Sequence, residues 1–185
     1  MGHQHETKRL TVTSETSRVF FALWPSEQLR MELAARMVDW IGDKPCRVMT
    51  QANLHVTLAF IGSIPAARLG GLVRIAQAMP TIACKLEFDR LAIWRPARVL
   101  VLSASHTPTA LLQWVQEFQA RLTQADFAVD TRPYRPHVTL ARDVRVAAME
   151  EMTPKLQWQV HDFALVESVS SPGGVHYQVL NTFAK

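Results

Sequence analysis

The sequence predicts an α+β fold with two pseudo-symmetric lobes, each an antiparallel sheet with outer helices, and a functional cleft between the lobes. The first observation is an exact repeat: His-Val-Thr-Leu-Ala occurs at residues 55–59 and again 82 residues later, at 137–141. The second is the order of expected strands and helices, which is about the same around each copy. The third is that no low-complexity tract or long linker separates the halves, so residues 18–185 are expected to form one bilobal domain.

Residues 1–17 are polar and are expected to form a flexible arm before the first strand. β-Branched and aromatic residues predict that strand at residues 18–24. A helix follows, because Ser26 can cap its first turn and Gly42 can end its last one. Apolar residues recur at helical spacing between them: Leu29, Leu33, Met37 and Ile41.

The first copy of the repeat is expected in a strand at residues 54–61, which follows a short strand near 46–49 and ends at Gly62. A second helix is predicted between Pro65 and Pro80, since proline favours a helix start and is excluded from a helix interior. The first half of the chain therefore alternates strands with helices.

The second half of the chain is expected to contain mostly strands and one helix. The strands are predicted at residues 85–94, 98–104, 137–144, 157–170 and 175–183. The helix starts near Pro108, and the strand after it carries the second copy of the repeat. Turn signals at residues 95–96 and 172–174 predict that the strands on either side of each turn pair as hairpins.

The repeat places matching side chains on one face of each strand. Because strand side chains alternate between faces, the histidine, threonine and alanine of a copy share one face, and its valine and leucine point the other way. The residues that share a face are His55, Thr57 and Ala59 in the first copy and His137, Thr139 and Ala141 in the second. Each copy thus offers an imidazole and a hydroxyl side by side.

The composition limits the class of protein. With 48% hydrophobic and 19% charged residues, the chain is typical of a globular protein and not of a disordered one. No apolar run approaches the ~20 residues that span a bilayer, and the polar start lacks the apolar core of a signal peptide. We therefore expect a cytoplasmic protein with no membrane association. A net charge of +4 suits an anionic ligand such as a phosphate or a nucleic acid.

Two imidazoles that face a common point are suited to paired proton transfer near neutral pH, one accepting a proton while the other donates one. The threonine hydroxyls can each donate a hydrogen bond to an oxyanion between them. These groups meet the requirements for opening a phosphodiester, in which the leaving oxygen must be protonated. Arg132 and Arg135 precede the second copy and Arg142 follows it, but alternation points Arg142 away from His137 unless the strand bulges or ends there.

No metal or cofactor is expected at this site. Neither copy of the repeat contains a carboxylate, which hard divalent cations prefer, and the remaining histidines lack the spacing of zinc ligands. Cys46 and Cys84 match no metal or redox motif and are expected to be buried apolar side chains.

The flanks of the two copies make the pattern more specific. The motifs His55-Val-Thr-Leu and His137-Val-Thr-Leu resemble the twin signature of the two-histidine (2H) phosphoesterase superfamily. Five longer segments resemble bacterial RNA 2′,3′-cyclic phosphodiesterases, also called 2′-5′ RNA ligases. They are Arg18-Val-Phe-Phe-Ala-Leu, Asn53-Leu-His-Val-Thr-Leu-Ala-Phe-Ile-Gly, Tyr134-Arg-Pro-His-Val-Thr-Leu-Ala-Arg, Leu165-Val-Glu-Ser and Ser171-Pro-Gly-Gly-Val-His-Tyr.

The resemblance implies metal-independent hydrolysis of RNA terminal 2′,3′-cyclic phosphates to 2′-phosphates, acting on RNA ends or cyclic nucleotides. It assigns His137 as the general base that activates water and His55 as the general acid that protonates the departing 3′-oxygen. The phosphate would be held by Thr57, Thr139 and Arg142. The resemblance also implies reverse 2′-5′ RNA ligation at the same site. We expect a monomer that needs no cofactor.

Other residues are candidates for contact with a base or with RNA. Phe21, in the first strand, would pack against a base. Arg135 would contact RNA or else lie in a solvated loop. Trp24 and Trp94 could line a base-binding wall, although core packing is the more common role of such tryptophans.

Two alternatives to catalysis are compatible with the residues. The histidines could be structural, but two histidines with matching polar neighbours would be costly to bury without a purpose. The protein could also be a nucleotide- or RNA-binding module that uses the same cleft without efficient catalysis. Intact histidine and threonine in both copies favour the enzyme.

Overall fold

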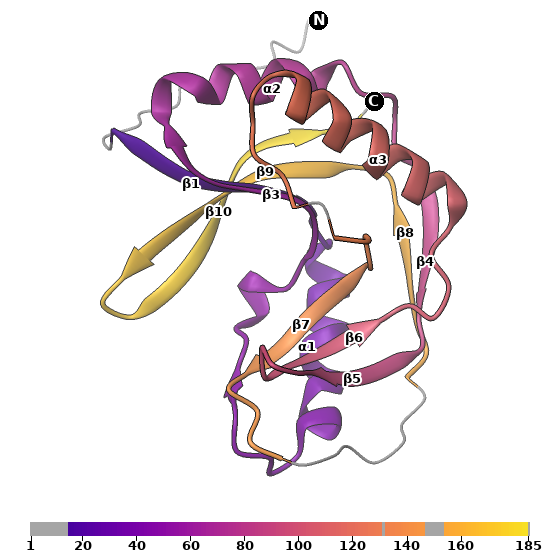
Figure 1. The fold of residues 1–185 in the computed structure, drawn as a ribbon. Coiled ribbons are helices and arrows are strands. Elements are labelled where there is room, and N and C mark those ends of the chain that lie inside the picture. The colour runs from indigo at the N-terminus through magenta and orange to yellow at the C-terminus, as the bar shows by residue number, and fades with distance from the viewer. Residues whose placement is uncertain (1–14, 131, 147–153, 185) are drawn as a thin grey trace, which may run out of the picture.

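The computed structural model describes residues 15–130, 132–146 and 154–184, and it confirms the α+β class (Figure 1). The helices are α1 (Glu27–Ile41), α2 (Leu69–Gln77) and α3 (Thr109–Gln124), with short 3₁₀ helices at Gln51–Asn53 and Ala66–Arg68. The strands are β1 (Thr16–Leu23), β2 (Arg47–Val48), β3 (Val56–Pro65), β4 (Cys84–Phe88), β5 (Arg90–Trp94), β6 (Val99–Ser103), β7 (His137–Arg142), β8 (Leu156–Val160), β9 (Phe163–Ser171) and β10 (Gly174–Phe183). None of the described helices is long and apolar enough to cross a membrane.

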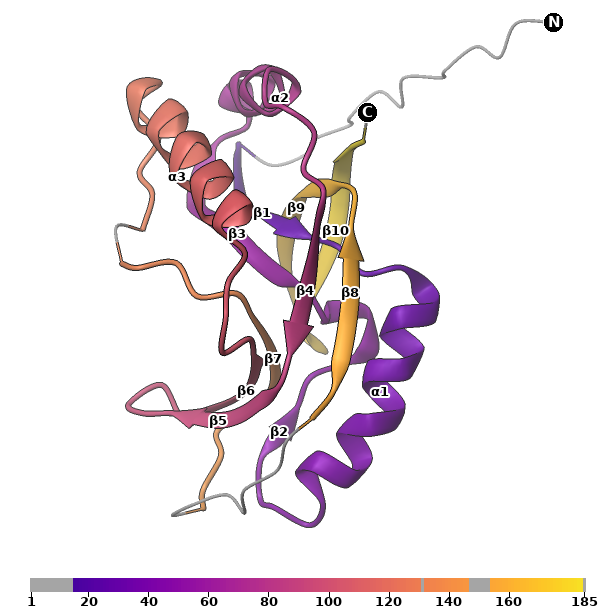
Figure 2. The same ribbon diagram turned by 90° about the vertical axis from the view of Figure 1, so that its right-hand side faces the viewer.

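The main sheet is antiparallel and is divided into two lobes, as predicted. Its strands follow the order β10-β9-β1-β3-β7-β6-β5, and β2 pairs with β7. A single residue pair, Val56 with Val138, joins β3 to β7. This narrow junction separates the β1 lobe (β1, β3, β9 and β10) from the β7 lobe (β2, β5, β6 and β7). β4 and β8 form a separate two-stranded ribbon that runs from one lobe toward the other (Figure 2).

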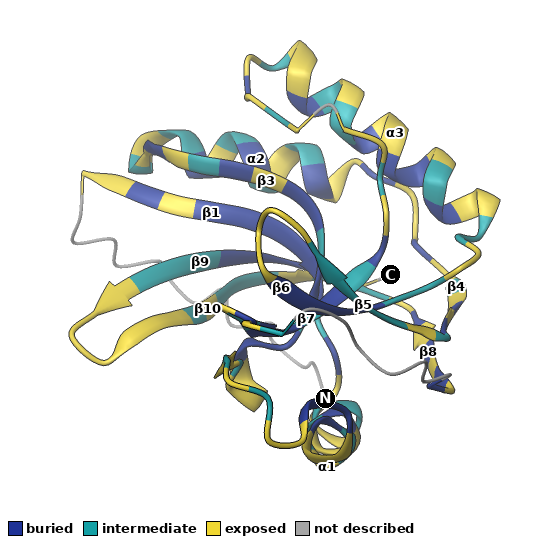
Figure 3. Ribbon diagram, turned by 60° about the horizontal axis from the view of Figure 1, so that its bottom comes forward, coloured by how far each residue is buried: buried dark blue, intermediate teal, exposed yellow. Residues whose placement is uncertain are grey.

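The helices cover the outer faces of the lobes. α2 and α3 lie over the β1 lobe, and α1 lies behind β7 and β6 in the view of Figure 1. One continuous apolar core contains side chains from these helices and from both lobes. Figure 3 shows that burial is greatest at the centre of the sheet and least at the tip of the β9–β10 hairpin. A smaller apolar cluster, made of Phe20, Ala22, Ala164 and Val166, lies on the other face of the β1 lobe.

The two lobes do not correspond to the two halves of the sequence. β9 and β10 come from the second half of the chain, but β9 pairs with β1 in the lobe of the first half. β8 likewise pairs with β4 across 68 to 76 residues of sequence, as Phe88 opposite Leu156 and Cys84 opposite Val160 show. Each half therefore needs strands of the other, which the order of elements alone does not indicate.

Two segments predicted as single strands are broken, and that part of the prediction was wrong. Residues 85–94 divide into β4 and β5 at Asp89, whose carboxylate accepts a hydrogen bond from the Ser105 amide (2.8 Å). Residues 157–170 divide into β8 and β9 at a polar pair, residues 161–162. Each break moves the chain out of the two-stranded ribbon and into the main sheet.

Gly62 does not end the first repeat strand, because β3 continues to Pro65. Gly62 instead sits inside the strand with a φ of +82°, a conformation that glycine adopts at little cost. Residues 1–14 of the predicted arm lie outside the described residues. The last two residues of the predicted arm belong instead to β1, which begins at Thr16, and Ser17 is buried there.

The local signals for caps and hairpins are confirmed. The Ser26 hydroxyl accepts a hydrogen bond from the Leu29 amide (3.2 Å) at the start of α1. Gly42 ends that helix with a positive φ, as its sequence position predicts. The predicted hairpins are β5–β6 and β9–β10.

Candidate active site

The junction between the lobes brings the two repeat histidines together. His137 is the first residue of β7, and His55 immediately precedes β3, so each lies next to the Val56–Val138 pair. The two rings are close enough for a charge on His137 to lower the pKa of His55. Both side chains are partly exposed, and the valine and leucine beside each of them are buried. The predicted alternation therefore holds at the start of each strand.

Each histidine is held in the same orientation by a main-chain carbonyl two residues before it. The Nδ1 atom of His55 donates to the Asn53 carbonyl (2.7 Å), and that of His137 donates to the Arg135 carbonyl (2.8 Å). A carbonyl oxygen can only accept, so Nδ1 carries the hydrogen and a neutral ring has its lone pair on Nε2. Both Nε2 atoms are thus available to accept a proton.

His55 lies in an aromatic surround. Its ring centroid is 4.9 Å from that of Phe20, 5.2 Å from Tyr177 and 5.9 Å from Trp24, which stacks with it. Burial against these rings, helped by the charges of His137 and Arg142, lowers the pKa of His55 to about 4, although the Asn53 carbonyl acts in the opposite direction. The neutral Nε2 accepts a hydrogen bond from the Thr57 hydroxyl (3.1 Å).

His137 has one aromatic neighbour and lies near the positive charges of two arginines. The Trp94 ring centroid lies 4.3 Å from that of His137. Burial lowers the pKa of His137, and the positive charges of Arg132 and Arg142 add to the effect, while the Arg135 carbonyl opposes it. The free protein therefore holds both imidazoles neutral at pH 7.

A β-bulge in each copy of the repeat decides where the following residues point. Leu58 has no partner on β1, because Thr57 pairs with Ala22 and Ala59 pairs with Phe21. In the same way, Leu140 of β7 has no pairing partner on β6. The bulge turns the repeat alanines into the core, so the prediction that they share the histidine face was wrong.

The second bulge also brings Arg142 to the His137 face. Once Ala141 points into the core, Arg142 lies on the opposite side, with the histidine. Its charge acts on both His55 and His137. It makes no hydrogen bond or ion pair with any residue in the described ranges, so its guanidinium is available to an anion. The corresponding residue of the first copy is Phe60, which is exposed and lies under the Arg18 guanidinium (4.9 Å).

Thr139 lies on the same face of β7 as His137, opposite Val101 of β6. Its side chain is partly exposed, as is that of Thr57 in the first copy. The structure therefore brings together His55, Thr57, His137, Thr139 and Arg142, the five residues predicted to act on the phosphate.

The structure places Phe21 away from this group. It is fully buried in the core, where its ring packs against those of Phe118 and Phe163, and it has no surface for a base. The neighbouring Phe20 contacts His55 instead. Arg135 is exposed, and its carbonyl orients His137.

Asn53 is a site residue that the sequence analysis missed. Its side chain is buried, donates to the Val175 carbonyl (2.8 Å) and accepts from the Tyr177 amide (3.2 Å). Its own carbonyl accepts the Nδ1 hydrogen of His55. The Asn53 side chain thus links the segment before β3 to β10, and its main-chain carbonyl orients the His55 ring. Its position two residues before the repeat histidine was the available signal.

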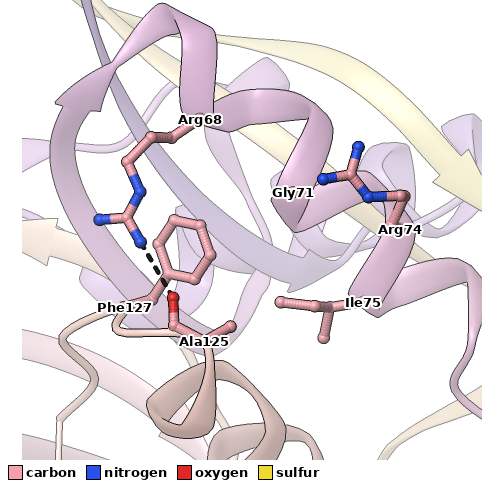
Figure 4. A pocket seen from close by; sticks show the side chains of 6 residues that line it. All are labelled: Arg68, Gly71, Arg74, Ile75, Ala125 and Phe127. Atoms are coloured by element: carbon pink, nitrogen blue, oxygen red, sulfur yellow. Dashed lines mark hydrogen bonds between the residues drawn. The ribbon is translucent and has the colours of Figure 1, made fainter.

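Two pockets lie outside the histidine pair. One of about 540 Å³ adjoins it through Trp24 and is lined by polar and apolar residues, mostly of α1, of β8 and of the turn after β8, including Gln28 and Gln157. The other, of about 320 Å³, lies between α2 and the end of α3 (Figure 4). There the Arg68 guanidinium donates to the Ala125 carbonyl (2.9 Å) and covers the Phe127 ring, which indicates a structural role. Nowhere in the described ranges do three or more His, Cys, Asp or Glu side chains gather as metal ligands would.

The chain is similar to known proteins over most of its length. A model of the 2′-5′ RNA ligase superfamily matches residues 24–171. The chain is 28% identical to an RNA 2′,3′-cyclic phosphodiesterase of Escherichia coli, with 92% of this chain and 98% of the relative covered. It is 26% identical to a protein of the same name from Thermus thermophilus, over 90% and 89% of the two chains.

Solved structures show the same fold. The apo crystal structure of E. coli LigT superimposes with a TM-score of 0.83 at 26% identity, and the complex of LigT with 3′-AMP gives 0.84 at 26%. Both comparisons cover 92% of this chain and 98% of LigT.

Proposed function

Because the chain belongs to the 2′-5′ RNA ligase superfamily, we propose that it hydrolyses RNA terminal 2′,3′-cyclic phosphates to 2′-phosphates without a metal ion. The observation that carries the proposal is the pair of imidazoles at the lobe junction, both with the lone pair on Nε2 and with Arg142 acting on both. The relatives named RNA 2′,3′-cyclic phosphodiesterase and the LigT complex with 3′-AMP support a nucleotide or RNA end as the ligand.

In this proposal the cyclic phosphate lies between the two histidines, with its charged oxygens toward Arg142 and Thr139. The Nε2 atom of His137 takes a proton from water as the water attacks phosphorus. The 3′-oxygen departs on the opposite side and receives a proton from the Nε2 atom of His55. The 2′-oxygen keeps the phosphate.

For His55 to act as a general acid, binding of the phosphate must first favour its protonated form. Burial keeps His55 neutral in the free protein, whereas a general acid must carry a proton. An anion between the rings favours the charged form of an imidazole and raises its pKa. Substrate binding therefore prepares the acid.

The test is to incubate the protein with 2′,3′-cyclic AMP and with an RNA that ends in a cyclic phosphate, and to identify the product by phosphorus NMR. We expect 2′-phosphate only. His55→Ala and His137→Ala should each reduce turnover by about 10³-fold or more, because each removes one proton-transfer group. The matched control His106→Ala changes an exposed histidine outside the site and should retain full activity.

Three results would contradict the proposal. They are a 3′-phosphate product, full activity after either histidine change, and loss of activity in EDTA. Binding of 2′,3′-cyclic AMP with no hydrolysis over hours would instead identify a nucleotide-binding module.

A further inference from the structure

The two histidines occupy equivalent positions but have different neighbours. His55 is surrounded by aromatic side chains that belong to, or pack against, the small cluster beneath it. His137 contacts Trp94, which belongs to neither apolar cluster. Trp94 is half-buried, so core packing does not account for it.

Trp94 approaches His137 from the side away from His55. The strands lie in the order β3-β7-β6-β5, so β5, which carries Trp94, and β3, which His55 precedes, are on opposite sides of β7. Trp94 pairs with Val99 at one end of β6, whereas His137 pairs with Ser103 at the other end. To lie 4.3 Å from His137, the indole must therefore extend back along the sheet toward the His137 end of β6.

The geometry of displacement at phosphorus indicates which reactant lies next to Trp94. The attacking and leaving oxygens lie roughly in line, on opposite sides of phosphorus. If His55 protonates the 3′-oxygen, the ribose of the cyclic phosphate lies on the His55 side. The nucleophile then lies on the His137 side, beside Trp94. This step rests on the proposed function.

A 5′-hydroxyl of a second RNA can take the place of water in the same reaction. The bond from phosphorus to the 5′-oxygen forms, and the bond to the 3′-oxygen breaks. The hydroxyl proton passes to Nε2 of His137, and the proton of His55 passes to the 3′-oxygen. The product is a 2′-5′ phosphodiester. The nucleoside that supplied the hydroxyl lies on the His137 side of phosphorus, next to Trp94.

We propose that Trp94 is the stacking platform for the first base of an acceptor RNA that carries a 5′-hydroxyl. A base can stack on an indole whatever its identity, and such stacking is a common means of holding single-stranded RNA. The surrounding lobe supplies positive charge for the acceptor's phosphates through exposed arginines. They are Arg90, Arg95 and Arg135. Trp94 thus selects an RNA nucleophile over water.

The experiment measures the ratio of 2′-5′-joined product to hydrolysed 2′-phosphate from one donor with a cyclic phosphate. The acceptor is a short 5′-hydroxyl RNA, used intact or with its first nucleotide abasic. We expect Trp94→Ala to lower the ratio about tenfold, the size of one base–aromatic stack, and Trp94→Phe to lower it less. The abasic acceptor should lower the ratio by a similar factor with the unchanged protein and have no further effect on Trp94→Ala.

The matched control is Trp24→Ala, which removes an indole on the His55 side. It should lower joining and hydrolysis in parallel and leave the ratio unchanged. A parallel loss in Trp94→Ala would overturn the proposal, because Trp94 would then act only by orienting His137. Independent effects of the abasic acceptor and Trp94→Ala would overturn it as well. So would hydrolysis without any joined product at saturating acceptor, whereas absence of hydrolysis would overturn the proposed function itself.

Discussion

The hydroxyl of Thr57 links the charge of His55 to anion binding. In the neutral ring, Nε2 accepts the hydrogen of this hydroxyl. When His55 is protonated, Nε2 becomes a donor, and the hydroxyl oxygen must accept from it. The hydroxyl hydrogen is then free to bind a phosphate oxygen. Charging of His55 and binding of an anion by Thr57 therefore favour each other.

The lowered pKa values of the two histidines predict an acidic optimum for kcat/KM. Catalysis as proposed requires His55 protonated and His137 neutral, and burial holds the pKa of His55 at about 4 and that of His137 below 6.5. The productive form of the free protein thus becomes more populated as pH falls below 6.5, until His137 is also protonated. Initial rates with 2′,3′-cyclic AMP at varied pH test this. An optimum on the alkaline side of 6.5 would contradict it.

The same measurements should separate kcat from kcat/KM. The kcat profile reports the complex, in which the bound phosphate raises the imidazole pKa values. We expect the kcat optimum at a higher pH than that of kcat/KM. Coincident profiles would show that the phosphate does not lie between the rings.

Asn53 offers a test of how His55 is positioned. Asn53→Ala leaves the Val175 carbonyl and the Tyr177 amide without partners in a part-buried place, so we expect a loss of about 2–3 kcal/mol in the free energy of unfolding. The turnover number should also fall, because the segment that orients His55 is released. Urea unfolding and steady-state kinetics measure both effects. The exposed Gln51, changed to alanine, is the control and should alter neither.

Which side chains face the lobe junction was predictable at this scale, but not which aromatic ring lies beside them. His55, Thr57, His137 and Thr139 follow from the alternation within the repeat. Phe20 and Phe21 are adjacent in a strand that is buried on both faces, so apolar character does not tell one face from the other. Only the packing of β9 and β10 shows that Phe20 lies toward the site.

Among the elements, β3 and β7 carry the site through a shared departure from regular strand geometry. The first three residues of each repeat alternate between the two faces of the sheet in the normal way. After the bulges at Leu58 and Leu140, the following residues lie on the opposite face from the one that alternation predicts. A β-bulge has no sequence signal in an apolar run, so alternation alone placed the alanines on the wrong face. The bulge at Leu140 explains how Arg142 comes to lie on the His137 face.

Two glycines in neighbouring elements should respond to alanine in opposite directions. Gly62 in β3 has a φ of +82°, so Gly62→Ala should destabilise the protein by about 1 kcal/mol. Gly70 in α2 lacks this constraint, and its new methyl group would meet only the end of the flexible Arg74 side chain, so Gly70→Ala should stabilise by about 0.5–1 kcal/mol. Midpoints of denaturant unfolding compare the two. A loss of stability in Gly70→Ala would contradict the prediction.

At the scale of the whole molecule, the exchange of strands between the halves predicts cooperative unfolding. One apolar core contains residues of both lobes, and β1 pairs with β9 across most of the chain. We expect far-ultraviolet circular dichroism and tryptophan fluorescence to give coincident denaturation curves. Trp40 in α1 and Trp114 in α3 report on the two lobes. Separate transitions would show that the lobes unfold independently.

The bilobal α+β architecture was predictable from the repeat, but the pairing of its strands was not. Local signals identified hairpins and helices because those contacts are close in sequence. The β1–β9 and β4–β8 pairs depend on contacts between distant segments, which a single sequence does not specify. The predicted monomer and cytoplasmic location stay predictions.

The Val56–Val138 pair is the only pairing of β3 with β7 in the described part of the chain, so it is the point about which the two lobes would bend. Points next to a pivot move least when two arms bend about it, and His55 and His137 are each adjacent to this pair. Bending of the lobes would displace the β9–β10 tip and the β5–β6 turn far more than it changes the spacing of the imidazoles. Any bending of the lobes would therefore leave the spacing of the two imidazoles nearly unchanged while the distant tips move apart.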